Sequence, residues 1–285
     1  YWSVYSDNVT WPMAWYTVAA MLDEQYGDSQ PIREAYEPMK KFMLHLKNRY
    51  DDHGIITRDV YGDWCLPPES PELIHSKDST RITRGPVLAT AAYYRLCRLM
   101  ERFAGIAGKA ADVALWQELG RETREAFNRC FYHADKGWYD NNTVTANILA
   151  LRWGLVPEGE EDRVFGQVVA KMTAAGTPHI STGVLGTQEI MRGLTDYGRG
   201  DIAYTLATNR TYPSWGFMTD HGATTIWELW NGDTANPRMN SGNHIMLLGD
   251  LVIWYYQYLA GIGQTSDSRG YSHIRLQPRI PEGLT

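Results

Sequence analysis

The sequence is poor in cysteine and has no long hydrophobic run, and both deficits exclude classes of protein. Its 285 residues include only three cysteines, Cys65, Cys97 and Cys130. This odd number at wide spacing fits neither a disulfide framework nor a set of zinc ligands, so we expect the thiols to serve in packing. The most apolar stretch, 245–262, is interrupted by Gly249, Asp250 and Gln257. A membrane-spanning helix needs about 18 uninterrupted apolar residues, so we expect no membrane span.

Clusters of positive charge and the common cofactor motifs are also missing. The formal net charge is -6, and no run of Lys or Arg is long enough to follow a phosphate backbone, which argues against a nucleic-acid partner. The sequence has no Gly-Xaa-Ser-Xaa-Gly elbow, no phosphate-binding glycine loop, no His-Glu-Xaa-Xaa-His zinc helix and no calcium loop. We therefore expect neither a cofactor nor a metal.

Apolar residues at three- and four-residue steps are abundant, and Gly, Pro, Asn or Asp separates them into segments. This periodicity is typical of amphipathic helices and predicts an all-α fold. One segment follows Ser29, an expected N-cap with Pro31 in the first turn, and its apolar face carries Ile32, Tyr36, Met39, Met43, Leu46 and Tyr50. The expected helices lie near 12–26, 31–50, 84–104, 109–131, 143–154, 158–175, 181–193, 198–210 and 243–261, with a doubtful one at 223–230.

The pattern of the chain changes after Gly263. A polar connector, 264–270, precedes the alternating segment 271–278, which is typical of a strand. We expect a helical domain over 1–263, followed by 264–285 as a linker and the first strand of a C-terminal β-rich domain. Short turns alternate with long loops, and this layout suits helix hairpins arranged in a toroid. The chain opens at Tyr1 without a signal segment, so we expect a piece of a longer protein; its compartment and oligomeric state stay open.

The stretch from Tyr212 to Asp233 is the most informative for chemistry. Glu228 stands among Trp215, Trp227 and Trp230, with glycines nearby that permit close approach to a ligand. Aromatic walls exclude water and raise the pKa of a carboxyl group, which suits an acid or base in sugar hydrolysis. The residues alone leave open that Glu228 caps a helix or pairs with an arginine.

His244 is the second candidate, because it follows Asn240-Ser241-Gly242-Asn243 and enters the last expected helix. The positive end of a helix dipole would disfavour protonation of an imidazole there. A neutral His244 could donate a hydrogen bond to a sugar hydroxyl. The alternative is a histidine that only caps and packs.

Two further acidic residues precede or accompany tryptophan. In Tyr61-Gly62-Asp63-Trp64, Asp63 could accept bonds from sugar hydroxyls while Trp64 provides a stacking surface. A structural turn explains the same pattern equally well. Asp7 could line the same pocket or cap the helix at 12–26. Carboxylates, tryptophans and a histidine together are the inventory of acid-base catalysis on a polyhydroxylated substrate.

Several of these strings closely resemble the bacterial α-L-rhamnosidases of glycoside hydrolase family 78. The strings are Tyr212-Pro213-Ser214-Trp215-Gly216, Gly222-Ala223-Thr224-Thr225-Ile226-Trp227-Glu228, and Asn243-His244 before the closing helix. Supporting strings upstream are Tyr61-Gly62-Asp63-Trp64, Thr143-Val144-Thr145-Ala146-Asn147 and Ser181-Thr182-Gly183. The resemblance implies an (α/α)6 toroid, here partial because its first hairpin is missing, followed by a C-terminal β-sandwich, with the active site in the mouth of the toroid.

The resemblance also implies a reaction, the inverting hydrolysis of terminal α-L-rhamnosides. One carboxylic acid protonates the leaving oxygen and one carboxylate, about 6.5–9.5 Å away, activates water. Glu228 matches the water-activating base. The acid belongs to a motif that is absent from these residues, so we do not expect the segment alone to catalyse well. By the same resemblance, a rhamnose-containing glycoside is the substrate, and the residues that contact the sugar are His244, Trp215, Trp230, Asp63 and Trp64.

Two other classes of function remain open from the sequence. Other helical-toroid glycosidases and sugar epimerases share an aromatic pocket of this kind. A toroid without its acid could also bind glycans without turning them over.

Overall fold

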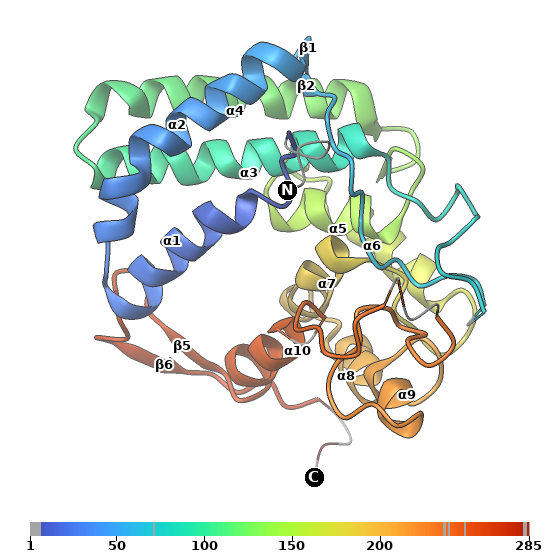
Figure 1. Ribbon diagram of the computed structural model, residues 1–285. Coiled ribbons are helices and arrows are strands. Elements are labelled where there is room, and N and C mark those ends of the chain that lie inside the picture. Colours follow the sequence, from blue (N-terminus) through green and yellow to red (C-terminus); the bar gives the residue numbers. More distant parts are fainter. Residues whose placement is uncertain are drawn as a thin grey trace. The chain divides into compact units, whose positions relative to one another are not determined.

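The computed structural model describes residues 7–70, 72–235, 238, 240–247, 249–281 and 284. The chain divides into two compact units, each built from separate stretches of sequence. The first unit comprises Tyr1–Gly62, Arg84–Tyr132 and Gly263–Arg275, and the second comprises Asp63–Thr83, His133–Ile262 and Leu276–Thr285. Helices provide most of the regular structure of each unit (Figure 1), as the apolar periodicity predicts.

The described residues of the first unit include four long helices and a short hairpin that follows the second of them. The helices are α1 (Met13–Tyr26), α2 (Gln30–Tyr50), α3 (Gly85–Ile106) and α4 (Ala110–Phe131). Strands β1 (Asp51–Asp52) and β2 (Ile55–Ile56) pair in an antiparallel register directly after α2. As expected, α2 begins after Ser29 with a proline in its first turn, although the Ser29 side chain makes no capping hydrogen bond. The predicted stripe of α2 is buried except for its last member, Tyr50, which is partly exposed.

A chain of hydrogen bonds connects side chains of α2 with side chains of α4 in this unit. The indole Nε1 of Trp116 donates to the Tyr36 hydroxyl at 3.0 Å, and that hydroxyl donates to Asp112 at 2.8 Å. Lys40 Nζ lies 2.6 Å from the same carboxylate, and its hydrogen bond holds the pKa of Asp112 below its ordinary value. The pKa of Tyr36 is raised above its ordinary value, and burial of the hydroxyl is the main cause. These hydrogen bonds therefore give partners to the polar groups that helix packing removes from water.

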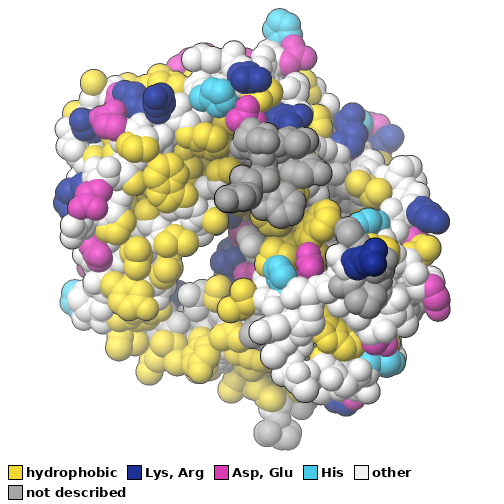
Figure 2. All heavy atoms as spheres, in the orientation of Figure 1, with side chains coloured by type: hydrophobic (Ala, Val, Ile, Leu, Met, Phe, Trp, Pro, Cys, Tyr) yellow, Lys and Arg dark blue, Asp and Glu magenta, His cyan; other side chains and the backbone are white. Residues whose placement is uncertain are grey.

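Helix α1 is apolar on its outer side as well as on its buried side. Figure 2 shows apolar side chains at the surface over this helix, and the large exposed ones are Trp15, Val18, Met21 and Tyr26. The opposite side of α1 buries Tyr16 completely. Exposed apolar patches of this kind are typical of surfaces that pack against other parts of a protein.

The second unit has shorter helices. They are α5 (Val144–Arg152), α6 (Glu161–Thr173), α7 (Val184–Asp196), α8 (Gly200–Thr208), α9 (Trp215–Asp220) and α10 (Gly249–Trp254), followed by the π-helix η2 (Tyr255–Leu259). Helix α7 packs against α5, α8 and α10. Two charged side chains of α7 form ion pairs within the unit: Glu189 lies 3.1 Å from Arg152, and Arg192 lies 3.2 Å from Asp250.

The remaining strands are two residues or three residues long. They are β3 (Tyr132–His133), β4 (Trp138–Tyr139), β5 (Ile262–Gln264) and β6 (Ile274–Leu276). β3 pairs with β4, and β5 pairs with β6. The strand predicted within 271–278 is thus present, although it is shorter. Its partner β5 begins two residues before the expected linker at 264, and the β-rich domain after 264 stays a prediction.

Two predictions about helices near the candidate site are wrong. The last helix begins at Gly249 instead of 243, and 223–230 is not helical. Conversely, α9 lies between the expected helices at 198–210 and 223–230, where no helix is expected. The Ser214 hydroxyl caps it by accepting from Phe217 N at 2.9 Å. The β-branched run Thr224-Thr225-Ile226 is a poor helix former, and its backbone pairs instead with the segment before α10.

The cysteine expectation holds in part. All three cysteines are free; Cys65 and Cys97 are buried, as packing residues are, but Cys130 is exposed. Within the described ranges, no helix is both long enough and apolar enough to cross a membrane.

We predict that Trp116→Ala destabilises the first unit strongly. Trp116 is fully buried, and its loss leaves a large cavity and removes the donor to Tyr36, so the free energy of unfolding should fall by about 3–5 kcal/mol. Urea unfolding followed by circular dichroism measures this change. The neighbouring exposed residue provides the control: Gln117→Ala should stay within about 0.5 kcal/mol of the wild type. Equal effects of the two substitutions would contradict the assignment of Trp116 to the core.

Candidate active site

The carboxylate of Glu228 is held by two hydrogen bonds from separate segments of the second unit. Trp64 Nε1 donates to Oε1 at 3.2 Å, and the backbone N–H of Ser241 donates to Oε2 at 3.1 Å. Glu228 is partly exposed, while its neighbours Trp227 and Leu229 are buried. The side chain is therefore fixed in orientation and still reachable from solvent. The alternative of a helix cap is wrong, because the two donors to the Glu228 carboxylate, Trp64 Nε1 and Ser241 N, both belong to residues outside helices.

Glu228 and His244 stand on two segments whose backbones pair with each other. Glu228 N donates to Ser241 O at 2.9 Å, and His244 N donates to Ile226 O at 2.7 Å. The hydroxyl of Thr225 adds a bond of 2.6 Å to Gly242 O. This pairing brings the two candidates predicted from separate strings into one small structure.

The expected helical environment of His244 is wrong. The residue precedes α10, which begins at Gly249, so its ring does not lie in the first turn of that helix. Its Nδ1 accepts a long bond of 3.5 Å from Met246 N. His244 is partly exposed, and its Nε2 has no hydrogen-bond partner among the described residues.

Two asparagines that the sequence did not indicate as site residues form hydrogen bonds that stabilise the loop around Glu228. Asn240 accepts from Leu229 N at 3.1 Å through Oδ1 and donates to Gly232 O at 3.3 Å through Nδ2. Asn231 donates to Leu73 O at 2.5 Å. Both asparagines stand inside the informative strings, and this proximity to Glu228 is the only signal that could have indicated them.

Asp63 caps the amino end of helix α7. Its Oδ2 accepts from Thr145 Oγ1 at 2.5 Å and from Gly183 N at 2.8 Å. Its Oδ1 accepts from Leu185 N at 2.9 Å and from Gly186 N at 3.2 Å. A carboxylate at this end of a helix also suits the helix dipole. Asp63 thus has a structural role, but as a cap of a distant helix and not in the turn weighed from the sequence, and the predicted bond to a sugar hydroxyl gains no support.

The electrostatics of Asp63 follow from its burial and its partners. Burial raises the pKa of the Asp63 carboxyl above its ordinary value, and the bonds from Thr145 and the three backbone amides act in the opposite direction. All four partners are donors, so the ionised carboxylate is the form whose oxygens they satisfy.

This cap also fixes Trp64. The backbone oxygen of Trp64 accepts from Val184 N at 2.6 Å, and a Cβ added at Gly183 would collide with the carbonyl oxygen of Asp63. Glycine at 183 therefore permits the close approach of segment 63–64 to α7. Trp64 is partly exposed, and its ring centroid lies 5.5 Å from that of His75. Its contact with a sugar stays a prediction.

The tryptophans that flank Glu228 in sequence serve in packing. Trp215 and Trp230 are 5% and 1% exposed, and their ring centroids lie 5.3 Å apart at 72°. Trp215 Nε1 donates to Leu247 O at 2.9 Å. Rings this deeply buried offer almost no face to a sugar, so their expected contact with the sugar gains no support either. Similarly, Gly232 admits the ring of Trp227, since an added Cβ would lie 2.7 Å from it.

Asp7 belongs to the first unit, and its carboxylate is already engaged there. It accepts a short hydrogen bond from the Tyr50 hydroxyl and lies 3.4 Å from His45 Nε2 and 3.8 Å from Arg49 Nε. The bond from Tyr50 is the main cause that lowers the pKa of Asp7. Asp7 does not cap α1, whose N-cap is Pro12, so that expectation is wrong.

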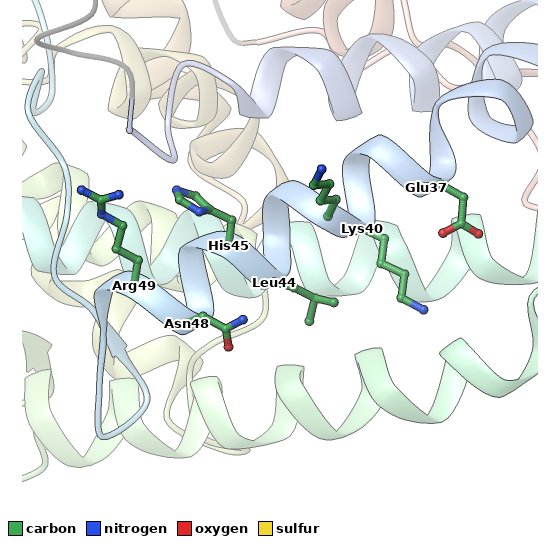
Figure 3. A pocket seen from close by; sticks show the side chains of 7 residues that line it. Glu37, Lys40, Leu44, His45, Asn48 and Arg49 are labelled. Atoms are coloured by element: carbon green, nitrogen blue, oxygen red, sulfur yellow. The ribbon is translucent and has the colours of Figure 1, made fainter.

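A groove of about 700 Å³ follows one face of α2 beside Asp7 (Figure 3). It is lined by Glu37, Lys40, Lys41, Leu44, His45, Asn48 and Arg49. Most of its charges are neutralised by the protein itself, because Lys40 pairs with Asp112 and Glu37 pairs with Lys109. The groove contains none of the residues predicted to act in catalysis. No three His, Cys, Asp or Glu side chains converge as metal ligands in the part of the chain that is described.

Comparison with known proteins places this chain in a family. Residues 1–259 match the model of the bacterial alpha-L-rhamnosidase 6 hairpin glycosidase domain. The alpha-L-rhamnosidase of Streptomyces avermitilis is 34% identical over 275 residues, which cover 94% of this chain and 25% of that protein. The chain thus spans about a quarter of the length of this curated relative.

Solved structures agree with the family match. The alpha-L-rhamnosidase from Dictyoglumus thermophilum superposes with a TM-score of 0.86 at 32% identity, covering 99% of this chain and 30% of that one. The Streptomyces avermitilis enzyme complexed with L-rhamnose gives a TM-score of 0.82 at 33% identity, covering 93% of this chain and 24% of that one.

We predict that Asp63→Asn weakens the second unit and loosens Trp64. One of the two oxygens becomes an amide nitrogen, so two donors of α7 or Thr145 face another donor, and each unpaired buried group costs about 1–3 kcal/mol. Thermal unfolding measures the loss of stability, and quenching of tryptophan fluorescence by acrylamide measures the exposure of Trp64.

Asp162→Asn is the matched control, because Asp162 stands exposed in the first turn of α6. Its loss should cost at most about 1 kcal/mol. If Asp63→Asn is as mild as this control, Asp63 does not anchor the segment that carries Trp64.

Proposed function

This chain belongs to the family of bacterial alpha-L-rhamnosidase 6 hairpin glycosidase domains, and from this premise we propose that it is the part of a glycoside hydrolase that activates water for the hydrolysis of terminal α-L-rhamnosides. The observation that supports the proposal is the partly exposed carboxylate of Glu228, oriented by Trp64 and by the backbone of Ser241. A substrate containing L-rhamnose agrees with the complex solved for the Streptomyces avermitilis relative.

Glu228 acts as the general base. Each carboxylate oxygen can accept more than one hydrogen bond, so Oε1 and Oε2 keep capacity for a water molecule after binding Trp64 and Ser241. The two fixed donors prevent rotation of the carboxylate, which keeps the attacking water in one place relative to the sugar. As water attacks the anomeric carbon, its proton passes to Glu228 and the bond to the leaving oxygen breaks.

A second carboxyl group completes an inverting mechanism. It protonates the leaving oxygen from the opposite face, at about 6.5–9.5 Å from Glu228. No counterpart of its motif occurs in the 285 residues, so we assign this acid to the remainder of the longer protein. We also propose an architecture for the longer protein. The helices of this chain contribute to an (α/α)6 toroid whose mouth holds Glu228. Residues 264–285 lead into a C-terminal β-domain.

His244 and Trp64 are the residues that bind the sugar in this proposal. Both are partly exposed, and both are connected to the Glu228 segment by hydrogen bonds. Trp215, Trp230 and Asp63 act behind them as supports that fix the loop and helix α7. Asp7 has no part in the proposal, because Tyr50, His45 and Arg49 already engage its carboxylate.

Glu228→Gln in the full-length protein should lower kcat on an aryl α-L-rhamnoside by about 10²–10⁴-fold, because general-base catalysis contributes this much. KM should change less than kcat, since glutamine keeps the shape of the side chain and one of its two acceptor oxygens, although its amide nitrogen then faces one of the two donors. Steady-state kinetics with the released aryl alcohol as the readout measures both constants.

Glu72→Gln is the control for this substitution, because Glu72 is an exposed carboxylate in the loop that carries Trp64. It should keep the rate within about twofold of the wild type, in line with the small effects of surface changes. Wild-type rates after Glu228→Gln would remove Glu228 from the mechanism. A preference for aryl glucosides over rhamnosides would overturn the assignment of the substrate.

The stereochemistry of the product tests the inverting step. Proton NMR of the first sugar released from an α-L-rhamnoside should show the β-anomer before mutarotation, because a single displacement by water inverts the anomeric centre. Initial release of the α-anomer would indicate a covalent intermediate and would contradict Glu228 as a base.

A further inference from the structure

The main chain and the side chain of Glu228 are both bonded to one residue, Ser241. The backbone N–H of Glu228 donates to Ser241 O at 2.9 Å, and the backbone N–H of Ser241 donates to Glu228 Oε2 at 3.1 Å. These two bonds close a ring through the Glu228 side chain. The orientation of the carboxylate therefore depends on the orientation of the peptide group that joins Asn240 to Ser241.

The Asn240 side chain holds this peptide group against the segment that carries Glu228. Asn240 Oδ1 accepts at 3.1 Å from the backbone N–H of Leu229, the residue directly after Glu228. Asn240 Nδ2 donates to Gly232 O at 3.3 Å. The carboxamide thus offers an acceptor and a donor to the opposite backbone, as the C=O and N–H groups of a paired strand do.

Gly232 lies against the residue on the other side of Glu228. A Cβ added at Gly232 would lie 2.7 Å from the ring of Trp227, so the backbone of Gly232 packs on this indole. Trp227 and Leu229 are 8% and 2% exposed. Asn240 is therefore connected to both buried neighbours of Glu228, to Leu229 directly and to Trp227 through Gly232.

We infer that Asn240 is a positioning residue for the reaction, because its side chain fixes the Ser241 N–H on Glu228 Oε2 and thereby aims the carboxylate at the attacking water. This inference rests on the proposed function, in which Glu228 is the general base. A displacement of about 1 Å at a reacting group can lower a rate by about 10²-fold. Asn240 contributes to the rate only through Glu228, which distinguishes it from a residue that only stabilises the fold.

A double-mutant cycle in the full-length protein tests this inference. It compares the wild type, Asn240→Ala, Glu228→Gln and the double variant on an aryl α-L-rhamnoside, at a temperature at which circular dichroism shows each protein to be folded. Asn240→Ala should lower kcat by about 10–100-fold and change KM by less than about threefold, since the change misaligns the base and leaves the sugar contacts in place. In the Glu228→Gln background the same substitution should lower kcat by less than about twofold, because a residue that acts through the base has no effect once the base is removed.

Asn48→Ala makes the same substitution at an exposed asparagine of α2 and should keep kcat within about twofold of the wild type. Asn240→Gln is the second variant and serves if the alanine variant does not fold. It keeps the carboxamide but displaces it by one methylene from Leu229 N and Gly232 O, so it should repeat the pattern of the cycle.

A fall in kcat that is confined to the background with Glu228 supports the positioning role. A kcat at the wild-type level after substitution of Asn240, or an equal fall in both backgrounds, overturns that role and leaves the proposed function intact. A kcat at the wild-type level after Glu228→Gln alone overturns the proposed function, and the positioning role with it.

Discussion

The carboxylate of Asp63 at the amino end of α7 is the interaction on which the candidate site depends. A carboxylate withdrawn from water is unfavourable unless donors surround it. Asp63 is only partly exposed, and Thr145 and three backbone amides supply four donors to it. The bonds hold segment 63–64 against α7 so closely that only glycine fits at position 183. As a result, the indole N–H of Trp64 lies within hydrogen-bond distance of Glu228, which is 164 positions later in the chain. A polar anchor, more than apolar packing, thus sets the position of the indole that donates to Glu228.

Tryptophans contribute to the site in two ways that depend on their exposure. Trp215 and Trp230 pack edge to face in the interior, where they give the loop around Glu228 a rigid base. Trp64 is partly exposed and uses its indole N–H on the carboxylate itself. One residue type therefore supplies both the support and the contact, and the difference lies in whether a ring face is left uncovered.

The chemistry is placed on irregular segments that helices hold in position, which is a common arrangement in helical scaffolds. Segments 225–229 and 240–244 pair through backbone bonds without forming a regular strand. Asn231 connects this pair to Leu73, which lies between β2 and α3. Asn240 connects the two paired segments to each other through Leu229. Because Glu228 and His244 are on this one paired structure, the same backbone hydrogen bonds position both residues.

The sequence by itself determined the helical character of the chain, most helix bounds to within a few residues, and Glu228 as a carboxylate set among tryptophans. These are local properties, since periodicity and turn residues act over a few positions. The tertiary structure alone decided that Asp63 caps a helix 120 residues away, that His244 precedes its helix, and that Trp215 and Trp230 are buried. Each of these outcomes depends on pairing between distant segments, where the burial of a group and the donors that it meets are set by neighbours that no local pattern records.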